Sequence, residues 1–355
     1  MSVPIVDLSL YLNRKTAPEA YAAEAAKAAK SLHTFGCLLL KDPRVDESHN
    51  DRFVDMLENY FNNSDGQRDA RPELSYQVGV TPDGMERPRD HCSGYRSSLL
   101  SSEQPVTPCP PGPDLKWRFF WRIGPTPNDT RYPSLNADPV VPEEFPEWPT
   151  TMDMWGGKML AALEALAGMA ATGFGLPEKS FQDMMYQGPH LLAPTGSNFY
   201  DSKTREITSD RALAGFHYDL NFLTIHGKSR FPGLYVWLRD GRRLPVKVPR
   251  GHLLVQAGRQ MEWLTGGHVK AGFHEVIVTD ATVAEIEKRE KERKSLWRVS
   301  STLFGHIASD QPLRPLGHFS SPESRQSFPV TDAGKMVQDE LNAIDLGVGS
   351  KIDAS

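Results

Sequence analysis

The chain has 355 residues, 39% of them hydrophobic, and a formal net charge of -5 at pH 7. Such a small charge, with acidic and basic residues interspersed, argues against a protein that binds nucleic acid or anionic membranes. No apolar run approaches the ~20 residues of a membrane span, and charge follows the apolar part of the N-terminus, unlike in a secretion signal. We therefore expect a cytoplasmic protein, monomeric rather than oligomeric, with no nucleic-acid or membrane partner.

The three cysteines, Cys37, Cys92 and Cys109, are an odd number at wide spacings. This pattern fits neither a disulfide framework nor a zinc cluster. We therefore expect reduced cysteines.

The N-terminal part predicts two helices around a strand. Residues 18–33 are rich in alanine, which costs least in a helix. Residues 35–42, "FGCLLLKD", form a short apolar run that predicts a buried strand. Residues 47–63 carry large apolar side chains at helical spacing, which predicts the second helix.

From about residue 104 to 150 proline becomes frequent and excludes regular helix over most of the segment. Its aromatic residues need burial, so we expect a long connection or lid that packs on the body of the protein. The stretch "KWRFFWR", residues 116–122, could instead offer aromatic walls and guanidinium groups to a small molecule, but packing is the favoured interpretation. Residues 154–177 then predict a long helix that ends at its glycines and proline.

After residue 190 the chain consists of short apolar segments separated by glycine, proline and charged turns. This density of short strands predicts a sandwich or barrel. A charged segment over residues 281–296 interrupts them and predicts a solvated helix. Residues 331–344 predict one last helix.

The stretch "AGFHYDLNFLTIHG", residues 214–227, places His217 and Asp219 two residues apart. On a strand, that spacing puts both side chains on one face. A third ligand is available from "GGHVKAGFHEVIV", which offers His268 and His274. Two histidines and one carboxylate are the ligands of non-haem Fe(II) oxygenases, whereas a structural zinc site is usually closed by cysteine.

Several segments match a known family in its own order. They are "VPIVDL" near the start, "SNFYD" at 197–201, "HYDLNFLTI" at 217–225, "LLVQAGRQMEWLTGGHVKAGFHEV" at 253–276 and "WRVSSTLFGH" at 297–306. With them the chain resembles the isopenicillin N synthase-like family of Fe(II)/2-oxoglutarate-dependent dioxygenases over roughly residues 3–345. The turn before the distal histidine departs from the family, because Arg259 stands where an acid is usual.

The resemblance implies a mainly β fold with flanking helices, built as a double-stranded β-helix (a jelly-roll, cupin-like barrel) behind an N-terminal region of helices and strands. Residues 1–150 would form that N-terminal region with its proline- and aromatic-rich connection. Residues 151–330 would form the dioxygenase core, preceded by the long helix. Residues 331–355 would form a C-terminal helix and tail.

For the site, the resemblance selects His274 over His268, so that His217, Asp219 and His274 would hold Fe(II). The cosubstrate 2-oxoglutarate would bind through four further residues. These are Arg298 and Ser300 at its distal carboxylate, Tyr200 as a third donor there, and Asn198 towards the keto-acid end. No catalytic residue is expected beyond the metal centre.

The implied reaction uses dioxygen and 2-oxoglutarate, gives succinate and carbon dioxide, and hydroxylates, desaturates or cyclises a small metabolite of secondary metabolism. The retained Asp219 argues against a halogenase. Two alternatives stay open. One is an iron oxidase of the isopenicillin N synthase type that needs no 2-oxoglutarate, and the other is an inactive barrel with a binding role.

The substrate itself is not identified by the sequence. Tyr95 and Arg96, in "CSGYRSS", lie where members of the family carry residues of the pocket edge, and Phe222 flanks the metal strand. We expect these three residues at the substrate.

Overall fold

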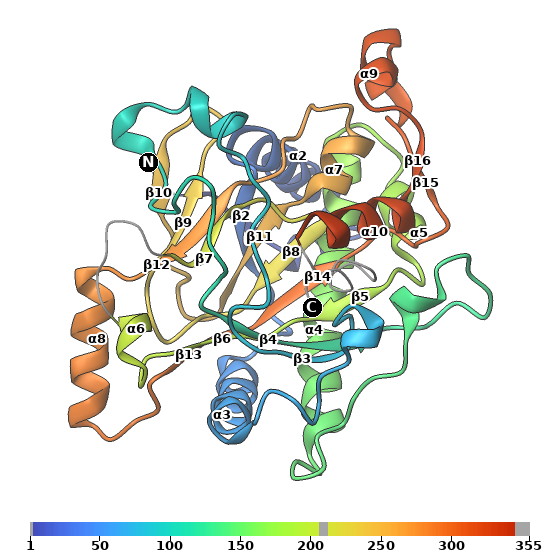
Figure 1. Ribbon diagram of the computed structural model, residues 1–355. Helices are drawn as coiled ribbons and strands as arrows, with labels where there is room; N and C mark the ends of the chain where they lie inside the picture. The colour runs from blue at the N-terminus through green and yellow to red at the C-terminus, as the bar shows by residue number, and fades with distance from the viewer. Residues whose placement is uncertain (1–2, 206–211, 345–355) are drawn as a thin grey trace.

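The computed structural model describes residues 3–205 and 212–344 (Figure 1). Its centre is a mixed ten-stranded sheet in which only β1 and β2 run parallel. In spatial order its strands are β1 (Ile5–Asp7), β2 (Cys37–Lys41), β11 (His252–Ala257), β8 (Leu223–His226), β14 (Thr302–Gly305), β5 (His190–Leu192), β4 (Trp117–Ile123), β6 (Thr195–Asn198) and β13 (Trp297–Ser300), with β3 (Gly79–Thr81) paired to β4. Strands from the first 150 residues thus share one sheet with strands from the second half.

A second sheet has four antiparallel strands in the order β10 (Arg243–Pro245), β9 (Leu234–Trp237), β12 (His274–Ile277) and β7 (Ala212–His217). A two-stranded ribbon joins β15 (Pro312–Leu313) to β16 (Thr331–Asp332). The predicted β-rich core with flanking helices is confirmed. Within the described residues the strands form open sheets and no closed barrel, so the jelly-roll barrel stays a prediction, as does the division at residues 150 and 330.

Three long helices pack against the large sheet: α2 (Pro18–Phe35) on β2, α3 (Glu47–Asn63) on β13, and α4 (Trp148–Gly173) on β4, β5, β8 and β14. The α4 helix is buried along most of its length, which explains its alanine-, leucine- and methionine-rich composition. The remaining helices are α1 (Ser9–Leu12), α5 (Ser180–Met185), α6 (Ser202–Arg205), α7 (Arg259–Leu264), α8 (Asp280–Lys291), α9 (Pro322–Ser327) and α10 (Ala333–Ala343), with 3-10 turns at Pro72–Leu74, Tyr95–Ser98, Ser101–Glu103, Pro133–Asn136 and Gly317–Phe319.

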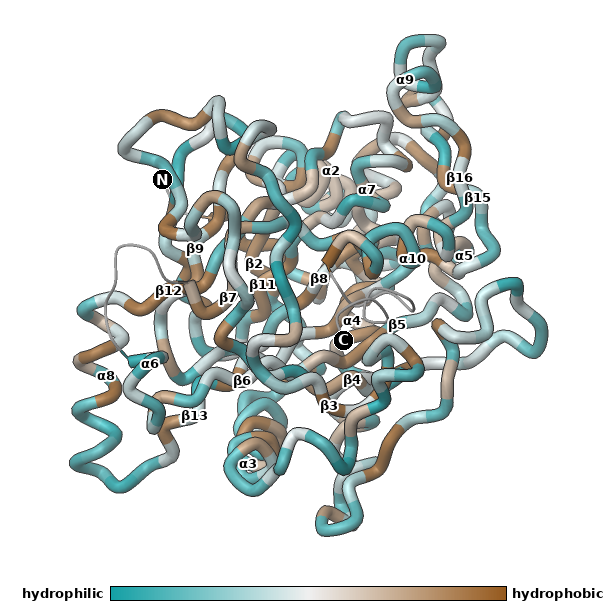
Figure 2. The backbone as a smooth tube through the Cα atoms, viewed as in Figure 1, coloured by the Kyte–Doolittle hydropathy of each residue, from teal (hydrophilic) through white to brown (hydrophobic). Residues whose placement is uncertain are grey.

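Hydropathy follows this arrangement. Figure 2 shows hydrophobic residues gathered along the central strands, while peripheral loops and most of α8 are hydrophilic. The helix α8 lies at the edge of the molecule in Figure 1 and is the predicted charged insertion. None of the described helices is both long and apolar enough to cross a bilayer.

Most predicted elements are confirmed, including the N-terminal helices, the long helix and the helix near the C-terminus, whose predicted tail at 345–355 lies outside the described residues. Two differences stand out. The second half of "HLLVQAGRQMEWLT" is helix α7 rather than strand. The proline-rich connection contains the seven-residue strand β4, since proline is absent from that stretch.

The strand β4 explains the two interpretations of "KWRFFWR". Its alternate residues face opposite sides of the sheet. Phe119 packs edge-on against Tyr60 and Trp148, in the core beneath the sheet. Arg118 and Phe120 line a cavity on the other side. One strand therefore both anchors the connection and forms a wall.

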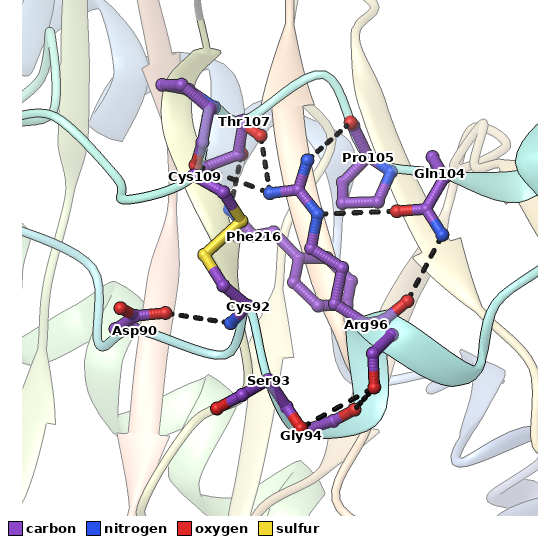
Figure 3. The surroundings of a disulfide bond; sticks show 12 residues. Asp90, Cys92, Ser93, Gly94, Arg96, Gln104, Pro105, Thr107, Cys109 and Phe216 are labelled. Atoms are coloured by element: carbon purple, nitrogen blue, oxygen red, sulfur yellow. Dashed lines mark hydrogen bonds between the residues drawn. A yellow bond between two sulfur atoms is a disulfide. The ribbon is translucent and has the colours of Figure 1, made fainter.

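The expectation of reduced cysteines is wrong for two of the three. Cys92 and Cys109 form a disulfide, with Cα atoms 5.8 Å apart (Figure 3). Cys37 is free and buried. The sequence pattern missed the bond because the two cysteines are brought together by a folded loop rather than by a repeated spacing. The disulfide joins the two ends of the loop over residues 92–109, which packs beside β7.

Candidate active site

Two strands of the small sheet bring a metal-ligand set together. His217 ends β7 and faces His274, the first residue of β12, in the antiparallel register. Asp219 lies two residues beyond His217, where the strand has ended. Its Oδ1 is 3.7 Å from His217 Nε2 and 3.9 Å from His274 Nε2. One ligand atom from each residue lies within 4.8 Å of the other two.

The polar atoms of these three side chains that do not face the proposed metal position already form hydrogen bonds. The Nδ1–H of His217 donates to the carbonyl oxygen of Gly215 at 2.6 Å, and that of His274 donates to Gly272 at 3.2 Å. The hydroxyl of Thr224 donates to Asp219 Oδ2 at 2.6 Å. This leaves two Nε2 lone pairs and one carboxylate oxygen directed at the same point, as a divalent metal requires.

Burial keeps the imidazole of His217 neutral. It lowers the pKa of His217 well below its ordinary value, helped by the neighbouring His274. Burial alone would raise the pKa of Asp219, but the two histidines and the hydrogen bond from Thr224 lower it, so that the carboxylate is ionised. Neutral imidazoles and an ionised carboxylate are the protonation states that bind Fe(II).

The loop that carries Asp219 is fixed by the start of α7. Backbone N–H groups of Gly258, Arg259 and Gln260 donate to carbonyl oxygens of residues 219–222. Gly258 is required there, because a Cβ atom at this position would lie 2.0 Å from the carbonyl oxygen of Asn221 and 3.0 Å from that of Asp219. Arg259 thus helps to hold the Asp219 loop through its backbone N–H rather than through its side chain.

We expect Gly258→Ala to lower both stability and metal affinity, because the backbone of the Asp219 loop must move to accept the methyl group. The expected costs are about 1–3 kcal/mol of unfolding free energy and about 10–100-fold in Fe(II) affinity, as for other supports of a metal ligand. Denaturant unfolding and anaerobic Fe(II) titration measure the two effects. Gly157→Ala, in open space on α4, is the matched control and is expected to be neutral or slightly stabilising; equal behaviour of both variants would refute this role of Gly258.

A buried guanidinium shares the cavity with the metal ligands. Arg298 on β13 lines it, and its one hydrogen bond to a described residue is a 3.4 Å contact from Nε to the carbonyl oxygen of Pro232. Burial lowers the pKa of Arg298 to about 10, so the group stays charged at neutral pH. No carboxylate among the described residues pairs with it, and an unpaired buried cation is costly. The arrangement therefore fits a ligand that brings its own carboxylate.

The family comparison agrees with this geometry. Residues 196–307 match the model of the 2OG-Fe(II) oxygenase superfamily, a range that holds all three metal ligands and Arg298. This part of the chain is therefore similar to a 2OG-Fe(II) oxygenase domain. The family prediction is confirmed, and with it, at the level of the family, the predicted cofactors Fe(II), 2-oxoglutarate and dioxygen. No curated protein matches the chain.

Solved structures share the fold of this chain over almost its whole length. A protein from Caulobacter crescentus named for the 2OG-Fe(II) oxygenase family is 21% identical, with a TM-score of 0.73 over 97% of this chain and 99% of its own. A full-length Neurospora crassa protein, solved in complex with alpha-KG, is 17% identical, with a TM-score of 0.73 over 96% of each chain. JOX2, in complex with 2OG, Fe and JA, is 17% identical, with a TM-score of 0.64 over 98% of this chain and 86% of its own.

The fold does not bring all four predicted cosubstrate residues together. Ser300 lines the cavity with Arg298, and its Oγ lies 3.1 Å from Thr302 Oγ1. Asn198 and Tyr200 do not line it. Asn198 Oδ1 accepts a hydrogen bond from the backbone of Tyr200, whose side chain is 53% exposed.

Strand register explains this correction. On β6, Ser197 lies opposite Arg298, whereas Asn198 lies opposite Trp297. Opposite residues share a face, and a shift of one residue turns a side chain to the other face. Ser197 therefore occupies the cavity side that the sequence comparison gave to Asn198.

The three residues expected at the substrate also have other roles. Tyr95 stacks on Phe273 at 4.7 Å between ring centroids and donates to the carbonyl oxygen of Leu238. The guanidinium of Arg96 bonds Gln104 and the carbonyl oxygens of residues 105, 107 and 108, which fixes the disulfide loop (Figure 3). Phe222 is fully buried against Phe181. None of the three lines the cavity, and α8 adds no described residue to it.

The cavity also has polar walls made by residues outside the predicted site. His226 on β8 bonds both Thr302 and Gln256, and burial lowers its pKa to about 4, so it is neutral at pH 7. Arg118 on β4 is the first of a row of buried, charged side chains. The alternation of "WRFFWR" was the signal for Arg118, whereas its partner Glu86 comes from an irregular segment without any signal.

Proposed function

We propose that the protein is an Fe(II)/2-oxoglutarate-dependent oxygenase that hydroxylates, desaturates or cyclises a small molecule bound in this cavity, with succinate and carbon dioxide as coproducts. The observation that carries the proposal is the presence, in one cavity, of three convergent metal-ligand atoms and a buried arginine without a carboxylate partner among the described residues. A mere binding protein has no need of both.

Each residue has a defined task in this proposal. His217, Asp219 and His274 would hold Fe(II) at the cavity. Arg298 and Ser300 bind the distal carboxylate of 2-oxoglutarate, for which a guanidinium fork is suited. Bound Fe(II) and 2-oxoglutarate supply the activation of dioxygen and the oxidising power.

The protein contributes orientation and exclusion of water. The hydrogen bonds from Nδ1 hold both imidazoles with Nε2 towards the metal, and Thr224 leaves Asp219 Oδ1 free. Phe120, Leu191 and Phe304 form an apolar wall of the cavity. Such a wall would exclude water from the reacting part of the substrate.

A spectrum tests the proposal. Anaerobic addition of Fe(II) and then 2-oxoglutarate to the metal-free protein is expected to give a weak visible charge-transfer band. Arg298→Gln removes a charged hydrogen-bonding partner of a carboxylate, so the 2-oxoglutarate concentration for half-maximal band is expected to rise about 10–100-fold. Arg122→Gln, also buried on the large sheet but outside the cavity, is the control.

The outcomes separate the alternatives. Fe(II) binding without the band would favour an iron oxidase that needs no 2-oxoglutarate. Absence of Fe(II) binding would leave a protein with a binding role.

A further inference from the structure

Four ionisable side chains form a row along one wall of the cavity, which we call the ion chain: Asp114, Lys116, Glu86 and Arg118. The Nζ of Lys116 lies 2.6 Å from Asp114 Oδ2 and 3.1 Å from Glu86 Oε2. Arg118 forms an ion pair with Glu86 Oε1. All four residues line the cavity, and Asp114, Glu86 and Arg118 are more than nine-tenths buried.

The ion chain is anchored at one end and open at the other. Asp114 Oδ1 accepts the backbone N–H of Gly215, two residues before the metal ligand His217. At the other end, the Nε–H of Arg118 has no hydrogen-bond partner among the described residues, although it is buried. Burial lowers the pKa of Arg118 to about 9, so the guanidinium is still protonated at neutral pH. The charge of Asp219 partly offsets this lowering, which shows that Arg118 lies near the proposed metal site.

An unmatched buried donor in a cavity indicates a ligand acceptor, because leaving such a group unpaired costs free energy. The charge of that ligand follows from the row itself. Two acids and two bases balance each other, so the ion chain presents no net charge. A buried anion would have to compete with Glu86 for Arg118, whereas a neutral acceptor leaves the ion pair intact.

The shape and polarity of the neighbouring wall add a second requirement. The guanidinium of Arg118 lies 4.0 Å from the ring centroid of Phe120, which forms an apolar surface with Leu191 and Phe304. A ligand beside Arg118 therefore places a polar edge on the guanidinium and the carboxylate of Glu86, and an apolar body on the aromatic wall.

We propose that Arg118 and Glu86 recognise the substrate, and that the substrate is a neutral molecule with a carbonyl group beside an N–H group, as in a lactam, imide or ureide. Arg118 donates to the carbonyl oxygen, and Glu86 accepts the N–H. This substrate class rests on the proposed function, since it assumes that the cavity holds the substrate of the oxygenase.

The test is a binding titration of the full chain with Fe(II) and saturating 2-oxoglutarate under nitrogen, so that Arg298 is occupied. Calorimetry gives the affinity, and the shift of the charge-transfer band shows binding beside the metal. The probes are succinimide and phthalimide, their N-methyl derivatives, and benzoate. We expect at least one imide to bind, its N-methyl derivative to bind at least about 10-fold more weakly, and benzoate to bind more weakly than the imide.

Variants of Arg118 test whether this residue recognises the imide. Arg118→Gln is expected to weaken imide binding about 10–100-fold while the 2-oxoglutarate band is retained. Arg118→Lys keeps the ion pair with Glu86 but lacks the Nε–H at that position, so it is expected to keep the thermal stability of the native protein and still lose imide affinity. Arg122→Gln, on the same face of β4 but outside the cavity, is expected to bind the imide normally.

Two failures are distinguishable. If the 2-oxoglutarate band never forms, the proposed function fails and the substrate class fails with it. If the band forms but neither imide binds, or benzoate binds more tightly, or the affinity does not depend on Arg118, the substrate class alone is overturned.

Discussion

His274→Ala is expected to abolish Fe(II)-dependent turnover of 2-oxoglutarate, whereas His268→Ala is expected to leave it unchanged. Removing one of three protein ligands should lower Fe(II) affinity by more than the roughly 10–100-fold typical of a residue that only supports a ligand. His268 is a matched control on the same segment. Its ring stacks on His33 at 4.1 Å between centroids, and it is not part of the metal-ligand group.

Two measurements check this expectation: anaerobic Fe(II) titration and succinate release in the presence of oxygen. Both variants should unfold at denaturant concentrations close to that of the native protein. If the His268 variant were inactive and the His274 variant active, the third ligand would have been assigned to the wrong histidine.

Glu275→Ala is expected to have a large effect on stability. Glu275 is fully buried next to His274 and accepts hydrogen bonds from the backbone of Val106 and from the backbone and hydroxyl of Thr107. The same hydroxyl oxygen accepts the N–H of Phe216, so that Thr107 joins the disulfide loop to both metal strands. Alanine would leave these buried donors unpaired, at a cost of about 3–5 kcal/mol.

Glutamine at this position should cost less, about 1–2 kcal/mol, because it keeps an acceptor. Burial raises the pKa of Glu275, which means that its ionised form is disfavoured in the folded protein and that a neutral side chain avoids this penalty. Denaturant unfolding compares the two variants with Glu287→Ala, an exposed change on α8 that should lie within about 0.5 kcal/mol of the native protein. A cost for Glu275→Ala no larger than for Glu287→Ala would show that the loop is held by other contacts.

Local sequence predicted the three residues that the structure brings together as a candidate metal-ligand set. His217 and Asp219 are two residues apart, and the register of the resemblance selected His274, which the structure places opposite His217. Arg298 followed in the same way from the strand after the charged insertion. These residues depend on short spacings and on the pairing of neighbouring strands.

Residues that depend on strand register or on distant packing were not predicted. Asn198 was chosen one position away from Ser197, and the alternation of β6 turned that difference into the opposite face. Arg118 could have been recognised from alternation, but Glu86, its partner, lies in irregular structure. Arg96 was expected at the substrate, yet its guanidinium binds its own loop.

The strands that carry the proposed metal ligands are separate from the wall proposed to bind the substrate, and this separation bears on how new substrates could be acquired. The proposed iron ligands lie on or just after β7 and β12 of the small sheet. Arg118 and Phe120 lie on β4 of the large sheet, and further cavity residues come from the segment around Glu86 and from α10. Under the proposed function, substitutions in β4, that segment or α10 are therefore expected to change which molecule is oxidised without disturbing the metal site. Directed evolution towards new substrates should gather its mutations there and leave the paired histidines untouched.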